Sequence, residues 1–325
     1  MDIVLTGSVA FDYLMSFPGN FRDHILTNKL QSISLSFLVD QMVKRRGGIA
    51  PNIAYNLALL GIKPRIMATV GSDFEEYRSW LDQKGVDTSA MVVIPGEFTA
   101  SFFANTDQEN NQIASFYTGA MAYAKQLSFY ELKGKKPDLV IISPNDPTAM
   151  NKYVKECQEL EIPYIYDPSQ QIVRLSGEDL RKGIEDALAL MVNDYEFGLI
   201  QKHTGMSEKD ILQNLSFMVI TQGENGSTIY TNSQTYQIPI VPPEKIIDPT
   251  GVGDAYRGGF LTGYNYGFDW QTCGEMGALS ASYCLGSSGP QSHSFTIDEY
   301  IAHFRKYFDD HEQLEVLRPV DKKII

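Results

Sequence analysis

The sequence predicts an α/β fold in which helices cover both faces of a mostly parallel β-sheet. Short, continuously apolar runs alternate with amphipathic stretches along most of the chain. Strands that are apolar on both sides belong to parallel sheets buried between helices. Of the 325 residues, 43% are hydrophobic, which is enough for one large domain or for a domain with a smaller appendage.

The expected elements of this sheet can be read in chain order. The apolar runs predict strands at residues 3–5, 139–143, 164–167, 189–193 and 217–221. Helical periodicity predicts helices at residues 52–60, 74–84, 149–160 and 178–188. Polar clusters follow the strands at residues 7–8, 143–146, 167–171 and 193–196. Because ligands of such sheets bind beyond the carboxyl ends of the strands, these clusters mark the candidate site.

Two segments interrupt the alternation and predict a small separate sheet. Residues 32–39 place Ile33, Leu35, Phe37 and Val39 on one face, with serines on the other, and residues 99–117 read as a hairpin that turns at 109–111. Exposed strands of this kind need a covering partner, either a ligand or a second subunit.

Composition excludes several classes of protein. The net charge of −13 argues against a nucleic-acid-binding surface, which needs clustered Lys and Arg. The sequence has no run of eighteen apolar residues and no basic N-terminal start, so we expect a cytoplasmic protein outside the membrane. Three widely spaced cysteines favour reduced, buried thiols over disulfides or a metal cluster.

Residues 248–254, with the sequence Asp-Pro-Thr-Gly-Val-Gly-Asp, suit phosphoryl transfer. Gly251 and Gly253, on either side of Val252, let the backbone turn its N–H groups toward an anion, and the helix that follows adds its positive end. Asp254 could then accept the proton of a hydroxyl that attacks ATP, although the helix terminus should lower its pKa. The alternative is an ordinary capped helix start.

Two further motifs could bind a sugar. Gly47 and Gly48 precede Asn52 at the start of a helix, and such glycines allow a ligand hydroxyl to approach the backbone. Asp12 could accept hydrogen bonds from two vicinal hydroxyls. The alternatives are a glycine loop that ends a basic run and, for Asp12, a turn aspartate.

The residues that follow two predicted strands could bind ATP and its Mg²⁺. Asn193 and Glu196 could hold the water shell of Mg²⁺, or they could form a helix N-cap. Residues 221–226, with Thr221, Gly223 and Gly226, could admit nucleotide phosphates or the adenine of ATP, or they could form a hairpin turn.

Aromatic and amide side chains could read a base. Phe102 and Phe116 lie on opposite arms of the predicted hairpin and could stack a purine between them, or they could pack beneath the small sheet. Gln170 and Gln171 could hydrogen-bond to the edge of the base, although loop glutamines are usually just solvated.

Taken together and in order, these motifs resemble the ribokinase-like family of sugar and nucleoside kinases over nearly the whole chain. Within this family the sequence is most similar to the bacterial adenosine kinases. The stretches that carry this similarity are residues 6–8, 34–40, 112–117, 119–121, 167–171 and 248–254. The runs Ser-Leu-Ser-Phe-Leu-Val-Asp and Asp-Pro-Ser-Gln-Gln are absent from general sugar kinases.

The resemblance implies a single domain over residues 1–325, an α/β/α sandwich with a small β lid formed by about 13–46 and 97–121. It implies ATP and Mg²⁺ as cofactors, with Asp254 as the base and Gly251, Val252 and Gly253 as the anion hole. Gly286 stands where many relatives carry an acidic residue, so a monovalent cation such as K⁺ is left open. The implied nucleoside ligands are Ser8, Asp12, Ser36, Gly48, Asn52, Phe102, Phe116, Met121, Gln170 and Gln171.

We therefore expect an adenosine kinase of purine salvage that transfers phosphate from ATP to the 5′-hydroxyl of adenosine. A ribose or fructose kinase and a catalytically silent nucleoside-binding protein are the alternatives. The apolar face of Leu35, Phe37 and Val39 also predicts a homodimer through the lid, which would bring Ser36 near the partner's nucleoside site.

Overall fold

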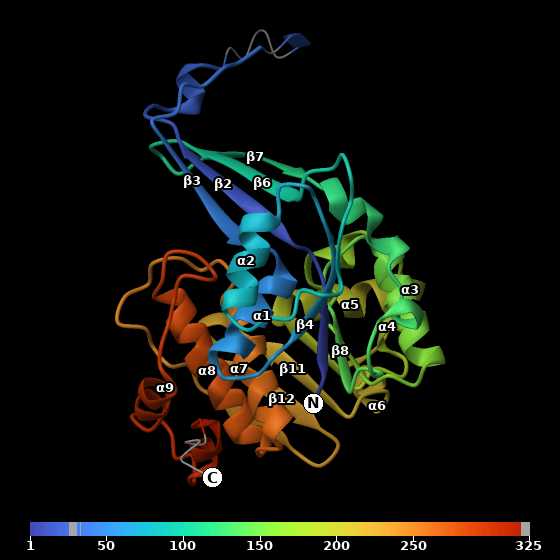
Figure 1. The fold of residues 1–325 in the computed structure, drawn as a ribbon. Coiled ribbons are helices and arrows are strands. Elements are labelled where there is room, and N and C mark those ends of the chain that lie inside the picture. Colours follow the sequence, from blue (N-terminus) through green and yellow to red (C-terminus); the bar gives the residue numbers. More distant parts are fainter. Residues whose placement is uncertain (26–30, 33, 320–325) are drawn as a thin grey trace, which may run out of the picture.

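The structure is a computed structural model that describes residues 1–25, 31–32 and 34–319. It contains a nine-stranded sheet and a four-stranded sheet (Figure 1). The large sheet has the order β13 (Thr235–Ile238), β12 (Ser227–Thr231), β11 (Phe217–Thr221), β10 (Ala189–Asn193), β9 (Tyr164–Tyr166), β8 (Leu139–Ile142), β1 (Ile3–Thr6), β4 (Arg65–Val70) and β5 (Met91–Val93). The strands from β11 to β5 in this order are parallel, and β12 and β13 continue one edge antiparallel.

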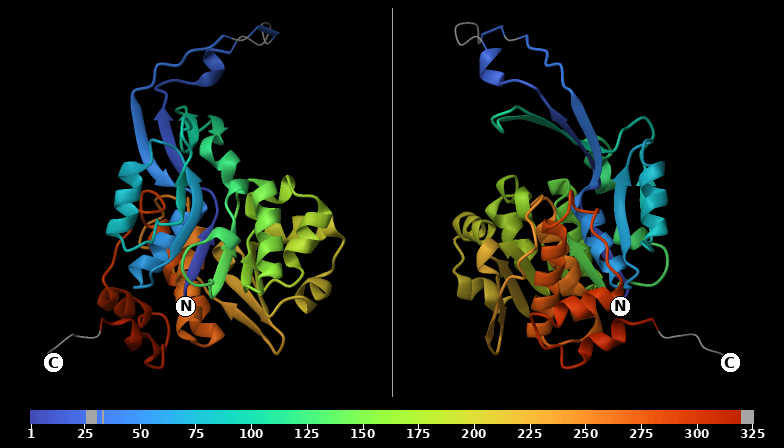
Figure 2. Two further views of the ribbon diagram at one scale, coloured as in Figure 1. Left: turned by 45° about the vertical axis from the view of Figure 1, so that its right-hand side comes forward. Right: turned by 90° about the vertical axis from the view of Figure 1, so that its left-hand side faces the viewer.

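Helices cover both faces of the large sheet, as the sequence predicts (Figures 1 and 2). One face packs against α1 (Ile49–Leu59), α2 (Glu75–Gln83), α7 (Val252–Tyr266), α8 (Trp270–Leu285) and α9 (Ile297–Phe304). The other face packs against α3 (Pro147–Glu159), α4 (Gly177–Ile184), α5 (Asp194–Thr204) and α6 (Glu208–Gln213). Within β1, Ile3 and Leu5 join the first core and Val4 joins the second. Both sides of β1 are thus buried, as are those of β8 and β9, which explains the continuous apolar runs.

The predicted strands of the large sheet agree with the observed ones to within one residue. The helices differ more at their ends. Helix α1 begins at Ile49, three residues before its predicted start, because Gly48 turns the chain with φ of 94° and Pro51 is tolerated in a first helical turn. Helix α4 ends at Ile184, and Asp186 with φ of 59° breaks the helical path before β10.

The small sheet lies beyond the carboxyl ends of the parallel strands (Figures 1 and 2). Its strand order is β3 (Gln41–Gly47), β2 (Ala10–Ser16), β6 (Ala100–Thr106) and β7 (Gln112–Tyr117). Strands β6 and β7 form the predicted antiparallel hairpin, and their turn is closed by N–H groups of Glu109 and Asn111 that donate to Asp107. This sheet can therefore cover ligands bound at the edge of the large one.

The strand predicted over residues 32–39 is wrong. Residues 34–39 contain no strand, and Ile33 lies outside the described residues. The ring of Phe37 packs within its own chain, with its centroid 5.0 Å from that of Phe17 and 4.8 Å from that of Phe21. Leu35 is 41% exposed. The apolar residues of this segment thus do not form the continuous strand face from which we predicted a dimer.

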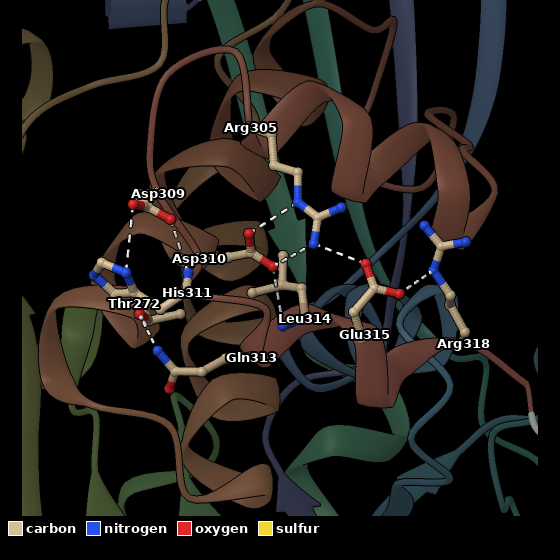
Figure 3. A network of polar contacts seen from close by, with 9 residues as sticks. All are labelled: Thr272, Arg305, Asp309, Asp310, His311, Gln313, Leu314, Glu315 and Arg318. Carbon is tan, nitrogen blue, oxygen red and sulfur yellow. Dashed lines mark hydrogen bonds and ion pairs between the residues drawn. The ribbon is translucent and has the colours of Figure 1, made fainter.

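The C-terminal segment is fastened to the core by ion pairs and hydrogen bonds (Figure 3). Arg305 donates Nε and Nη2 to the two carboxylate oxygens of the buried Asp310, over 2.8 and 2.9 Å. It also donates to Glu315 over 2.7 Å, and Gln313 donates to the hydroxyl of Thr272 on α8. The bidentate pair closes the chain after α9 on itself, and the hydrogen bond from Gln313 joins this segment to α8. In the described part of the chain, no helix has the length and apolarity that a membrane span requires.

Candidate active site

The first turn of α7 has the backbone geometry that the predicted anion-binding loop requires. Gly251 caps the helix with φ of 78°, a left-handed conformation that glycine adopts without strain. A side chain at this position would place its Cβ 2.3 Å from the Cβ of Pro290. The first N–H groups of a helix have no acceptor within it, and they point out of its positive end. The loop thus offers N–H donors to an anion, with Asp254 in the same turn.

Asp254 is joined to α1 by a directed hydrogen-bond network. Asn52 donates Nδ2 to Oδ2 of Asp254 over 2.8 Å. The side chain of Gln291 donates Nε2 to Oδ1 of Asn52 over 2.9 Å and to the hydroxyl of Tyr77 over 2.5 Å. Because Oδ1 of Asn52 accepts from Gln291, its amide group can present only N–H toward Asp254. Asn52 is 5% exposed, so this orientation is held inside the protein.

Gly258 in α7 makes the hydrogen bond between Asn52 and Asp254 possible. A Cβ at Gly258 would lie 2.4 Å from the Cβ of Asn56 on α1, closer than two carbon atoms can approach. Asn56 is itself fixed, because it donates to the carbonyl of Asn52 and its Oδ1 lies 2.8 Å from Nε2 of His293. The close approach of α1 and α7 thus brings Asn52 within reach of Asp254.

Asp254 has a pKa close to neutrality. Burial raises the pKa of Asp254 to about 7, Arg257 and the hydrogen bond from Asn52 lower it, and Asp167 and Glu196 raise it. The expectation that the helix terminus makes this group a weak base is therefore wrong, because burial is the largest influence on this pKa and raises it. A carboxylate with this pKa accepts a proton more readily than an ordinary aspartate.

Arg257 lies one turn further along α7 and links the loop to β9. Its Nη2 forms an ion pair with Oδ1 of Asp167 over 2.7 Å, and both side chains are buried. Burial by itself lowers the pKa of Arg257, but the nearby carboxylates of Asp167, Asp254 and Glu196 raise it, and the net shift is upward. Burial raises the pKa of Asp167 to about 6, and Arg257 opposes this rise. At pH 7 both partners are therefore charged.

Asp12 lies on the small sheet in a row of directly paired residues. It is paired with Arg45 on β3 and with Phe102 on β6, and Phe102 is paired with Phe116 on β7. Residues paired in this way project from the same face of a sheet. Burial raises the pKa of Asp12 to about 6, while Arg45 lowers it and Asp248 raises it. Asp12 is therefore a strand residue and not the turn aspartate of the alternative interpretation.

Arg45 connects the small sheet to the anion-binding loop. Its Nη1 donates to Oδ2 of Asp248 over 2.5 Å, and its Nη2 donates to the hydroxyl of Ser288 over 2.8 Å. Asp248 in turn accepts from the backbone N–H of Thr250 over 2.9 Å. The face that carries Asp12 is thus tied to the start of the loop that carries Asp254.

Several predicted ligand residues have a structural role in the fold. Ser8 accepts a hydrogen bond from the N–H of Ile49 at the start of α1. Gly48 is needed because a Cβ there would lie 2.5 Å from the carbonyl oxygen of Ser8. Asn193 and Glu196 form a capping box on α5, and a Cβ at Gly226 would lie 2.0 Å from the carbonyl of Ile238. These roles agree with the helix-cap and hairpin interpretations of the sequence.

The predicted base-binding residues are only partly brought together. Phe102 and Phe116 project from one face side by side, so a purine can lie across them but cannot be stacked between them. Met121 packs against Ala10 and Ala100 on the same face. Gln171 is 7% exposed, and its Oε1 has no hydrogen-bond partner among the described residues. The remaining two candidates, Gln170 and Ser36, are exposed.

Sequence reasoning missed three residues of this site, Arg45, Arg257 and Gln291. Their partners are far away in the chain, 203 residues for Arg45 and Asp248 and 90 residues for Arg257 and Asp167. Arg257 had a detectable signal, because it is a charged residue within an apolar helix. Two cavities, of 760 and 330 Å³, are lined by none of the predicted site residues.

Comparison with known proteins places this geometry in a family. The chain matches the pfkB family carbohydrate kinase profile over residues 15–297. It is 30% identical to a nucleoside kinase of Methanocaldococcus jannaschii, over 94% of this chain and 97% of that one. The chain belongs to the pfkB family of carbohydrate kinases. The resemblance found in the sequence is thereby confirmed.

Solved structures agree with this assignment. A ligand-free nucleoside kinase of Burkholderia thailandensis superposes on this pfkB-family kinase with a TM-score of 0.85 at 40% identity, over 93% of this chain and 99% of the other. An adenosine kinase of Sinorhizobium meliloti shares the fold, with a TM-score of 0.71 at 17% identity, over 94% and 98%. The protein is a phosphotransferase that acts on alcohol groups.

The position of Asp254 predicts the effect of removing its charge. Asp254→Asn should lower kcat by at least about 100-fold, because a general base and its positioning are both lost. Binding of both substrates, measured by calorimetry, should remain. The exposed Asp186→Asn, in a left-handed turn that asparagine tolerates, is the matched control. Turnover close to that of the unmodified protein would remove Asp254 from the mechanism.

The pKa of Asp254 also predicts a pH dependence. Only the deprotonated carboxylate can accept a proton, and its fraction rises with pH through about 7. The ratio kcat/KM for the acceptor should therefore rise through that pH at saturating ATP. The hydrogen bond from Asn52 lowers the pKa of Asp254. In Asn52→Leu this bond is absent, so the midpoint of the profile should move to higher pH. A profile that is flat from about pH 5.5 to 8.5 would contradict this role.

Proposed function

We propose that this protein is an ATP-dependent nucleoside kinase that phosphorylates the 5′-hydroxyl of adenosine and so returns it to AMP in purine salvage. One observation carries the proposal. Asn52, a predicted sugar ligand, donates directly to Asp254, the predicted base, beside the glycines of the anion-binding loop. The acceptor hydroxyl, the base and the phosphate loop would thus meet at one point.

The sugar would bind between the two sheets. The carboxylate of Asp12 has two oxygens for a pair of vicinal hydroxyls. Gly47 keeps this space open, because a Cβ there would lie 2.6 Å from Oδ2 of Asp12. Gly48 follows directly, and Asn52 lies one turn into α1. A ribose held by these groups would direct its 5′-hydroxyl toward Asp254.

The base would lie against the aromatic residues of the small sheet, which would act as a lid. Phe102 and Phe116 belong to the same row as Asp12, so a base could lie flat on them while its ribose contacts the carboxylate. The free Oε1 of Gln171 suits a donor such as the amino group of adenine. Two solved structures of the Burkholderia thailandensis nucleoside kinase are complexes with inosine and with ADP-inosine, at 39% identity to this chain, which supports a purine nucleoside.

ATP would bind along the carboxyl ends of β10 and β11. Strand β10 ends at Asn193 and β11 at Thr221, and Gly223 follows two residues later. The phosphates of ATP would extend from these strand ends to the loop of Gly251 and Gly253. Mg²⁺ would accompany the phosphates and offset their charge. Glu196 accepts from the N–H of Asn193 and from the hydroxyl of Ser169, and its remaining lone pairs fit water molecules of the Mg²⁺ shell.

The reaction would be an in-line transfer. Asp254 orients the 5′-hydroxyl and takes its proton as the new bond to phosphorus forms, while ADP leaves with the electrons of the broken bond. The N–H groups around Gly251 to Gly253 would stabilise the transferring phosphoryl group. A base with a pKa near 7 is half deprotonated at neutral pH, so it is available for this step.

A substrate panel tests the proposed function. The purified protein is given ATP, Mg²⁺ and one of adenosine, inosine, guanosine, cytidine, ribose or fructose, and ADP formation is measured. We expect the highest kcat/KM with adenosine and a 5′-phosphate product by mass spectrometry. Turnover of ribose or fructose but not of adenosine would identify a sugar kinase. Absence of ADP with every acceptor would identify a silent nucleoside-binding protein.

The sugar site predicts a selective loss of nucleoside affinity. Asp12→Ala should weaken adenosine binding by about 2 kcal/mol, because hydrogen bonds to a charged acceptor are the strong ones. ATP affinity should barely change. Calorimetry that showed weakened ATP and unchanged adenosine would reverse the assignment of the two sites.

We also propose that two copies of the chain pair through the small sheet. Its face opposite Asp12 carries exposed apolar side chains, with Met42 62%, Phe103 38% and Ile113 45% exposed. An exposed four-stranded sheet with such a face needs a cover, and a second copy would supply one symmetrically. The exposed Ser36 would then be available to the partner's nucleoside site.

Sedimentation velocity tests this pairing. The unmodified protein should sediment as a dimer at micromolar concentration, and Ile113→Asp should convert it to a monomer without loss of helical circular dichroism. Val316→Asp, at an exposed apolar residue of the C-terminal segment, is the control. A monomer in the unmodified protein would defeat the proposed pairing.

A further inference from the structure

Arg257 is a buried arginine whose guanidinium is only partly used by the protein. Its side chain is on α7 and is 8% exposed. Nη2 donates to Asp167 over 2.7 Å and lies 3.5 Å from the carbonyl oxygen of Met191. Among the described residues, the buried Nε has no hydrogen-bond partner, and Nη1 forms no hydrogen bond. Buried donors are nearly always paired, so unpaired ones call for an explanation.

The unpaired end of Arg257 lies beside the anion-binding loop. A Cβ added to Gly253 would lie 3.0 Å from Nη1, so this nitrogen is next to the backbone of the first turn of α7. Side chains of a helix point back toward its N-terminus, and residue 257 is one turn after residue 253. The guanidinium is thus directed at the place where a transferred phosphoryl group would bind.

A positive charge at this place needs a negative partner. The N-terminus of a helix already carries a partial positive charge, which disfavours a cation. Asp167 anchors one side of the guanidinium, and Asp254 and Glu196 add negative charge nearby. The carboxylates outnumber the arginine, so an incoming phosphate needs a direct donor to offset their repulsion. Nη1 is placed to be that donor.

We propose that Arg257 is a further catalytic residue, which donates Nη1–H to an oxygen of the phosphoryl group in transfer while Asp167 holds the guanidinium in place. This inference rests on the kinase function proposed above. In the transfer, the bond from phosphorus to the leaving oxygen of ADP breaks as the bond to the acceptor oxygen forms. The acceptor proton passes to Asp254, and Arg257 keeps its own proton throughout.

The proposal predicts that Arg257 distinguishes nucleotides by their terminal phosphate. In Arg257→Gln, calorimetry with Mg²⁺ should show binding of β,γ-methylene ATP weakened by about 10- to 100-fold, the usual range for a hydrogen bond to a charged group. Binding of ADP should change by less than about threefold, and kcat should fall by at least the factor lost for the ATP analogue. Arg257→Lys should retain part of the affinity for the ATP analogue and part of kcat, because lysine keeps the charge without the planar guanidinium group.

Two further variants separate catalysis from folding. The double variant Arg257→Gln/Asp167→Asn also removes the carboxylate that Arg257→Gln alone would leave without its ion-pair partner, and it should show the same selective loss of the ATP analogue. Arg65 is likewise 8% exposed and pairs with Asp2 over 2.6 Å, far from the site, so Arg65→Gln is the matched control with an unchanged ratio of ATP-analogue to ADP affinity.

Each result decides a different claim. Equal weakening of the ATP analogue and ADP, or no weakening of either, in a protein whose unmodified form phosphorylates nucleosides would overturn the role of Arg257 and leave the proposed function intact. Failure of the unmodified protein to phosphorylate any nucleoside would overturn the proposed function itself. The nucleotide-binding measurement needs no acceptor, so the two failures cannot be confused.

Discussion

The close approach of α1 and α7 is the constraint on which the rest of the site depends. It exists because Gly258 has no side chain, and it brings Asn52 to 2.8 Å from Asp254. On the other side of α7, a Cβ at Gly259 would lie 2.4 Å from the carbonyl of Met276 on α8. Helix α7 is therefore held between two helices, and its first turn cannot shift without breaking this packing. This packing fixes the positions of the anion-binding loop and of Asp254.

A second connection runs from this loop to the small sheet. Arg45 pairs with Asp248, and it shares a row of paired residues with Asp12 and Phe102. A movement of the small sheet would therefore displace Arg45, and through its ion pair Asp248, at the start of the loop before Gly251. The side chains of Arg45 and Asp248 are 23% and 15% exposed, so solvent screens their interaction only in part. Its importance lies in geometry, since it couples the surface that would cover a substrate to the loop that would hold the phosphate.

The sequence alone predicts the fold well and the site only in part. Strands buried on both faces leave continuous apolar runs, so β8 to β11 were located to within one residue. The segment before β3 was misjudged, because the alternation around Phe37 reflects contacts with Phe17 and Phe21 and not a strand. The glycines and Asp254 were found, since local motifs carry them. The pKa of Asp254 was judged in the wrong direction, because its burial, which raises the pKa, depends on contacts between distant parts of the chain.

A crystal structure of the complex with adenosine, ADP, Mg²⁺ and aluminium fluoride tests the central claim most directly. We predict that the 5′-oxygen of adenosine lies within hydrogen-bonding distance of Asp254, that the ribose hydroxyls contact Asp12, and that the fluoride ligands contact the N–H groups at Gly251 to Gly253. A complex in which the 5′-oxygen faces another carboxylate, or in which the aluminium fluoride lies away from the first turn of α7, would contradict it.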